Sequence, residues 1–283
     1  MLQKIKTLSP FIQVVVLFLI GLISFVVISI LATVLVTSIY PNVSAEHTEE
    51  LQNNYPSLYM LIFFAPFQLG VLLIPSLIYW FCLRANKLSP RINFKTLSWS
   101  VLLFIVIVLL LPFFSEINHI FTRLFGVYDT LEAQKIASDK VLTQLVSFSN
   151  SSYLVGLLII GIITGISEEF AFRGFLQHHI FHHTNRLDLA ILGSALIFAL
   201  LHFNYFQFLP LFIFGVVLAM IFHVTKSVWL GTFFHAGNNM LNVYWLRNDN
   251  FPNFLEEHSL IITIPSALVL MGLLYYNKKK FNL

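Results

Sequence analysis

The chain has 283 residues, of which 58% are hydrophobic and only 10% are charged. An ordinary soluble domain has about 25% charged residues, so this composition excludes a soluble globular protein and predicts an integral membrane protein. The formal net charge of +3 is small, and the basic residues are spread among short loops, which argues against nucleic-acid binding. The single cysteine, Cys82, excludes an intrachain disulfide and a zinc site made of several thiolates.

The first apolar run extends from about residue 11 to residue 40 and follows Lys4 and Lys6. A cleaved signal peptide has an apolar core of about 7–15 residues. This run is roughly twice that length, so we expect a retained first membrane span. Runs of about 20 mostly apolar residues along the chain predict an all-α membrane protein, a bundle of about eight transmembrane helices. The predicted spans are 12–39, 58–83, 97–114, 152–176, 187–206, 209–224, 228–246 and 260–276.

The loop charges predict how these spans are oriented. Most Lys and Arg residues fall on the side of the amino terminus if every predicted span crosses the membrane: Lys4, Lys6, Arg84, Lys87, Arg91, Lys95, Arg173, Arg186, Lys226 and Lys278 to Lys280. Because basic loops stay in the cytoplasm, we expect both termini to be cytoplasmic. The longest loop, 115–151, carries apolar residues at helical spacing (Ile117, Ile120, Phe121, Leu124 and Phe125). This spacing predicts an amphipathic helix on the outer surface.

Two adjacent carboxylates, Glu168 and Glu169, lie in the fourth predicted span. An ionisable side chain near the bilayer centre costs at least about 2.5–3.5 kcal/mol, so these groups need partners. Glu169 and Arg173 are four residues apart, which is the spacing of a same-face ion pair. Glu168 points about 100° away around the helix and is free for another role. The alternative is a helix end whose charged side chains all lie in the cytoplasmic headgroup layer.

Two other predicted spans carry polar side chains. His202 lies in the fifth span, and His235 and Asn239 lie in the seventh, four residues apart and therefore on one helix face. A lone histidine in a membrane helix is usually a hydrogen-bonded packing residue. Polar groups on three spans instead predict a shared polar cavity inside the bundle.

This set of side chains suits hydrolysis of an amide bond. A buried glutamate can act as a base for water, and a histidine can relay the proton. A second histidine and an amide can donate hydrogen bonds to a developing oxyanion. Alternatively, one glutamate and two histidines are the ligand types of a catalytic zinc with an open water position. The sequence has no His-Glu-x-x-His motif that would favour zinc.

Three short motifs resemble, in order, the successive motifs of the CPBP intramembrane protease family: Glu168-Glu169-x-x-x-Arg173, Phe198-x-x-x-His202 and His235-x-x-x-Asn239. That family includes the CAAX proteases of prenylated proteins and the bacterial Abi-type proteins. The resemblance covers about 165–245. The first 150 residues carry no motif of the family.

The resemblance implies a catalytic set of Glu168, His202, His235 and Asn239, supported by Glu169 and Arg173. In this family the glutamate and the first histidine would activate water, and the second histidine and the asparagine would stabilise the oxyanion. Both metal-dependent and metal-free mechanisms are proposed for the family. We favour a site that requires no cofactor; if zinc is bound, we expect Glu168, His202 and His235 as its ligands.

The sequence therefore predicts an intramembrane endopeptidase of a bacterial plasma membrane, with three segments. Residues 1–150 form the first spans and the outer loop, residues 151–250 form the catalytic core, and residues 251–283 form the last span and a basic tail. The expected partners are membrane lipid and a membrane-associated protein or peptide, which could be a prenylated CAAX substrate. The alternatives are a non-enzymatic immunity or partner-binding protein of the same fold, and a small transporter that relays protons through buried carboxylates.

Overall fold

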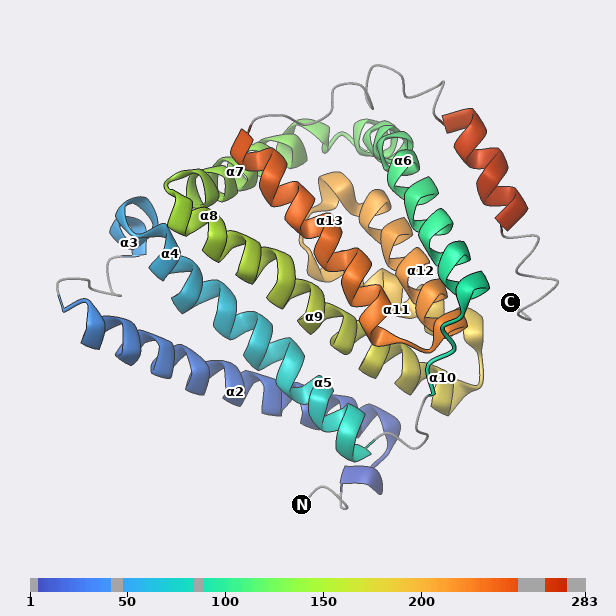
Figure 1. Ribbon diagram of the computed structural model, residues 1–283, viewed down its shortest axis with the longest axis horizontal. Helices are drawn as coiled ribbons and strands as arrows, with labels where there is room; N and C mark the ends of the chain where they lie inside the picture. Colours follow the sequence, from blue (N-terminus) through green and yellow to red (C-terminus); the bar gives the residue numbers. More distant parts are fainter. Residues whose placement is uncertain (1–4, 42–47, 84–88, 249–262, 274–283) are drawn as a thin grey trace. The chain divides into compact units, whose positions relative to one another are not determined.

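The computed structural model describes residues 5–41, 48–83, 89–248 and 263–273, and the regular secondary structure in these ranges is helical (Figure 1). Five helices are long and apolar enough to cross a bilayer: Pro10–Ile39, Pro56–Leu83, Phe94–Leu124, Asn150–Thr184 and Tyr205–Thr225. The predicted class, a helical membrane protein, is confirmed by this arrangement. The chain forms two compact units.

The first unit contains Met1–Lys87, Asp139–Phe175 and Thr232–Asn250. Its helices in chain order are α2 (Pro10–Ile39), α3 (Thr48–Asn54), α4 (Pro56–Tyr59), η1 (Met60–Phe64), η2 (Phe67–Leu73), α5 (Ile74–Ile78), η3 (Tyr79–Leu83), α8 (Asn150–Gly156), η4 (Leu157–Ile163) and α9 (Thr164–Glu169). The segments α4 to η3 make one continuous spanning helix, and α8 to α10 make another. Three elements run from one unit into the other: α7 (Tyr128–Ser147), η5 (Phe170–Gln177) and α13 (Val228–Asn248).

Small residues let the helices of the first unit approach closely. The helix α2 lies along η2 and α5 (Figure 1). A Cβ atom added to Gly70 would lie 2.4 Å from the backbone of Phe25, so a larger residue at this position would separate the two helices. Such small-residue contacts are typical of helix packing in membranes, where the surrounding lipid is as apolar as the side chains.

Close contacts at glycine also join α13 to the Asn150–Thr184 helix. Three glycines on that helix face α13, and a Cβ atom on each would come within 3 Å of it or of a neighbouring helix. At Gly161 the nearest atom is Cγ of Met240 at 2.6 Å, and at Gly165 it is the backbone of Ala236 at 2.9 Å. Gly156 meets a Val146 methyl at 2.9 Å and a Val243 methyl at 3.8 Å. The two helices are therefore in contact along several turns, which fixes their register at the carboxylates that follow Gly165.

The second unit contains Leu88–Ser138, Leu176–Gly231 and Phe251–Leu283. Its helices are α6 (Phe94–Leu124), α10 (His178–Thr184), α11 (Leu187–Leu201), η6 (Tyr205–Gln207), α12 (Phe208–Thr225) and the short Thr263–Leu273 helix. The side chain of Asn118 on α6 donates to the backbone oxygens of Tyr205 and Phe206 and accepts from the amide of Leu209. This buried side-chain amide thereby provides hydrogen-bond partners for backbone groups of the turn before α12 and of its first residues.

Two details differ from the sequence prediction. The residues expected to form a helix in the 115–151 loop instead continue α6 to Leu124, and the separate helix of that segment is α7. The helix α6 ends where Gly126 adopts φ +69°, a conformation that glycine reaches without steric cost. The predicted span 187–206 is shorter, because α11 ends at Leu201 and Phe203 adopts φ +51°. The predicted span 260–276 is described only over Thr263–Leu273.

Candidate active site

The centre of the candidate site is the carboxylate of Glu169, which is completely buried in the first unit. Its Oε1 atom lies 2.8 Å from a guanidinium nitrogen of Arg173 and 2.9 Å from Nδ1 of His235. Arg173 and His235 are themselves only 1% and 2% exposed. The ion pair expected from the four-residue spacing of Glu169 and Arg173 is therefore present. The contact with His235 links the Asn150–Thr184 helix to α13.

Close helix packing produces this arrangement. Gly165 lies one turn before Glu169 and packs against the backbone of Ala236. Ala236 is the neighbour of His235 in the chain. Because glycine has no Cβ atom, α13 comes near enough for the imidazole to reach the carboxylate. The π-helical segment η5 begins directly after Glu169 and contains Arg173.

The second nitrogen of His235 faces the other carboxylate. Nε2 of His235 lies 3.6 Å from Oε2 of Glu168, whose residue is 7% exposed. If Nδ1 of His235 donates to Oε1 of Glu169, the ring nitrogen that faces Glu168 is Nε2.

Asn239 lies one turn beyond His235 on α13 and is half-buried. Its amide nitrogen donates to the backbone oxygen of Ile160 in η4 at 3.3 Å. A side-chain amide carries two N–H donors, so this bond uses one and leaves a second. The bond also fixes the direction of the amide relative to His235.

His202 belongs to the second unit, where it caps α11. Its Nδ1 lies 2.7 Å from the backbone oxygen of Phe198, and its ring lies 4.4 Å from the Phe198 ring. Donation from Nδ1 to that carbonyl leaves Nε2 as an acceptor. The convergence of His202 with Glu168, which belongs to the first unit, stays a prediction.

A catalytic zinc requires three protein ligands. In the first unit only Glu168 and His235 stand together as candidate ligands, because Glu169 is committed to Arg173. Among the described residues, no group of three or more His, Cys, Asp and Glu side chains is arranged to hold a metal ion. A zinc site would therefore need a third ligand, for which the sequence predicts His202 of the second unit.

The sequence analysis missed the bond between Glu169 and His235. It assigned Glu169 to Arg173 alone, because i, i+4 spacing reveals partners only within one helix. Gly161 and Gly165 indicated a close helix contact, but the sequence did not identify the partner helix. The contact of Gly165 with Ala236 identifies α13 as the partner helix.

Comparison with known proteins agrees with this geometry. The family model of the Rce1-like proteins, described as type II CAAX prenyl endopeptidase Rce1-like, matches residues 150–241. No curated protein and no solved structure matches the chain significantly. The matched segment contains all six residues predicted for the site. The resemblance predicted from the three motifs is therefore confirmed over residues 150–241, which are similar to the Rce1-like CAAX prenyl endopeptidases.

Proposed function

We propose that the chain is an intramembrane endopeptidase that hydrolyses a peptide bond of a membrane-associated protein or peptide, with prenylated CAAX proteins as the first substrate class to test. The observation that carries this proposal is the buried network in which Glu169 joins Arg173 to His235 while Glu168 faces the same imidazole. Burying two carboxylates and an arginine is costly. Such groups in a membrane protein are typical of a functional site.

In the proposed reaction Glu168, assisted by His202, removes a proton from water, and the water oxygen attacks the scissile carbonyl carbon. The C–N bond then breaks, and the proton held by Glu168 passes to the leaving amine. Both steps need a carboxyl group that can accept and return a proton near neutral pH. The burial of Glu168 and its position 3.6 Å from Nε2 of His235 suit this role.

His235 and Asn239 act as donors to the oxyanion in this scheme. Because Nδ1 of His235 already donates to Glu169, donation to substrate must come from Nε2, and the ring is then an imidazolium. The ionised Glu169 stabilises that positive charge. Asn239 contributes its second N–H. Glu169 and Arg173 are positioning residues, since they act through His235.

We favour this metal-free scheme, and the alternative is a zinc held by Glu168, His202 and His235. If zinc were bound there, it would polarise the carbonyl and activate the water. The bond from Nδ1 of His235 to Glu169 would then orient a ligand, as carboxylates commonly do for metal-binding histidines. Metal analysis of active protein distinguishes the two schemes.

The proposed membrane arrangement has about eight spans and two cytoplasmic termini, in a bacterial plasma membrane. Five of these spans are the helices that are long and apolar enough to cross a bilayer. We propose α11, α13 and the Thr263–Leu273 helix as the other three.

The direct test uses full-length protein in proteoliposomes with a farnesylated CAAX peptide and its unprenylated counterpart. We expect cleavage of the prenylated peptide and loss of cleavage with Glu168→Gln. Glu132→Gln, which replaces a carboxylate on α7 outside the matched segment, is the control. Trapping with Glu168→Ala in the native cell would then identify the physiological substrate. Tight capture of one protein without cleavage by the wild-type chain would favour the non-enzymatic alternative.

A further inference from the structure

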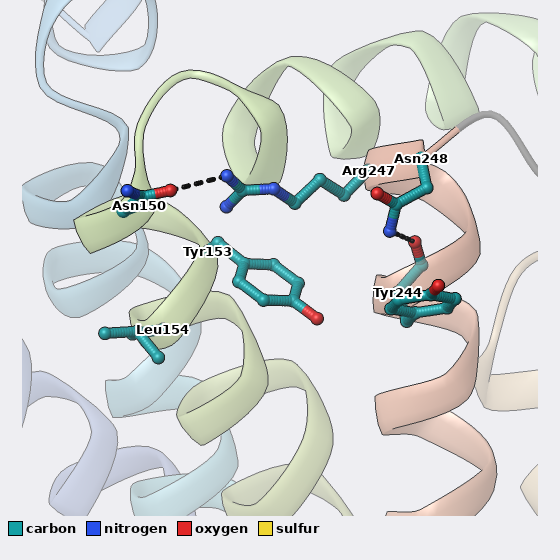
Figure 2. A pocket seen from close by; sticks show the side chains of 6 residues that line it. All are labelled: Asn150, Tyr153, Leu154, Tyr244, Arg247 and Asn248. Carbon is teal, nitrogen blue, oxygen red and sulfur yellow. Dashed lines mark hydrogen bonds between the residues drawn. The ribbon is translucent and has the colours of Figure 1, made fainter.

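A pocket of about 380 Å³ lies away from the carboxylates in the first unit. Figure 2 shows that it is bordered by the first turns of α8 and the last turns of α13. Its lining residues are Asn150, Tyr153, Leu154, Tyr244, Arg247 and Asn248. The Asn150–Thr184 helix, which begins with α8, and α13 also carry the candidate site. However, Tyr244 is nine residues from His235, about 13 Å along a helix. The pocket is therefore a separate feature of the molecule.

Arg247 supplies the positive charge of the pocket. Its guanidinium donates to Oδ1 of Asn150 at 2.6 Å (Figure 2). It also donates to the backbone oxygen of Ser149 at 3.4 Å. It also lies 4.4 Å from the centre of the Tyr153 ring. These partners are neutral, and among the described residues no carboxylate pairs with Arg247. The contacts hold the side chain in place, and the described lining of the pocket carries the positive charge of Arg247.

The surroundings of this charge are those of a membrane interface. Tyr153 and Tyr244 are aromatic residues with a polar tip, which membrane proteins place at the level of the lipid headgroups. Next to the guanidinium, Leu154 is 64% exposed and Tyr244 is 47% exposed. Leu158, one turn beyond Leu154, is 48% exposed. The guanidinium of Arg247 therefore lies at the end of an exposed apolar surface, which Leu154 and Leu158 form along the Asn150–Thr184 helix.

We propose that this pocket binds an anionic phospholipid, with the headgroup phosphate at Arg247 and an acyl chain along Leu154 and Leu158. A guanidinium fork matches the geometry of phosphate oxygens and forms charge-assisted hydrogen bonds with them. The amides of Asn150 and Asn248 border the same space and provide further donors. The positive charge of Arg247 favours a lipid with net negative charge over a zwitterionic one. This inference is independent of the proposed protease activity.

The test measures lipid retention by the full chain in detergent with native mass spectrometry, and thermal stability with added lipid. Phosphatidylglycerol should bind and raise the Tm, whereas phosphatidylcholine should bind at least several-fold more weakly. Arg247→Gln should weaken phosphatidylglycerol binding about tenfold, as expected for the loss of a charged hydrogen-bonding partner. Arg123→Gln is the matched control, because Arg123 likewise lies 4.3 Å from a tyrosine ring, that of Tyr128, and is not among the residues that line this pocket.

A second pair of variants keeps the test decisive if Arg247→Gln folds poorly. Leu154→Trp should fill the pocket and lower phosphatidylglycerol binding, while Leu158→Trp, outside the pocket lining, should leave the phosphate contact intact. Millimolar inorganic phosphate should not displace the lipid, because it lacks the acyl contact. Equal binding of both lipids, or unchanged phosphatidylglycerol binding with Leu154→Trp, would overturn the proposal. Displacement by phosphate would also overturn it in favour of a simple phosphate site.

Discussion

Nδ1 of His235 lies 2.9 Å from Oε1 of Glu169, and this single hydrogen bond ties α13 to the helix that carries both buried carboxylates. It gives the adjacent glutamates different tasks. Glu169 contacts both Arg173 and His235, and we propose that Glu168 is the carboxylate that exchanges protons.

This division predicts opposite defects for two conservative substitutions. Glu168→Gln should fold normally and lose activity, because an amide cannot act as the base. Glu169→Gln should lower the folded yield, since breaking a buried ion pair costs about 3–5 kcal/mol. The measurements are the yield of monodisperse protein and peptide cleavage.

The double variant Glu169→Gln with Arg173→Met separates charge from structure. It removes the unpaired buried charge, so it should recover folded yield relative to Glu169→Gln alone. A Glu169→Gln protein that folds like wild type and is fully inactive would show that our division of roles is wrong.

Asn239→Ala should fold and lose about 10²–10³-fold in kcat, the usual effect of removing one oxyanion donor. KM should change less, because the hydrogen bond strengthens only in the transition state. Asn242→Ala, three residues further along α13 and exposed, is the matched control. Equal activity of the two variants would remove Asn239 from the catalytic set.

Chelation tests the metal-free scheme. Purified protein should keep its activity after exhaustive treatment with a chelator, with no transition metal detected by elemental analysis. About one zinc per chain, with activity lost on removal and restored by zinc, would instead assign the metal to Glu168, His202 and His235. Either result leaves the protease proposal standing.

Packing at Gly165 can be tested through stability. In Gly165→Ala the new methyl would lie 2.9 Å from Ala236, so the helices must separate. We expect a destabilisation of about 1–3 kcal/mol from overpacking and reduced activity, because His235 moves from Glu169. Gly237→Ala on α13 meets no atom within 4 Å and should preserve both the Tm and the activity. Similar behaviour of the two variants would contradict the close-contact explanation.

Reporter fusions test the orientation. Fusions after Arg91 and after Leu283 should report a cytoplasmic location, and a fusion after Glu50 should report the outside. The physical basis is the preference of Lys- and Arg-rich loops for the cytoplasmic side. The reversed pattern would show that the loop-charge argument is wrong.

The sequence alone determined the membrane class, the chemical inventory and the pair between Glu169 and Arg173. Hydropathy is a sum over consecutive residues, and i, i+4 spacing is a property of one helix, so both can be calculated from chain order. The ordered motifs were sufficient to predict the family matched by residues 150–241.

Only the tertiary structure decided which side chain His235 contacts, where α6 and α11 end, and that a cationic pocket lies between α8 and α13. The contact between Gly165 and Ala236 joins segments about 70 residues apart in the chain, and its existence depends on helix register and close approach. Helix ends likewise depended on single backbone conformations, at Gly126 and Phe203, which hydrophobic periodicity does not encode.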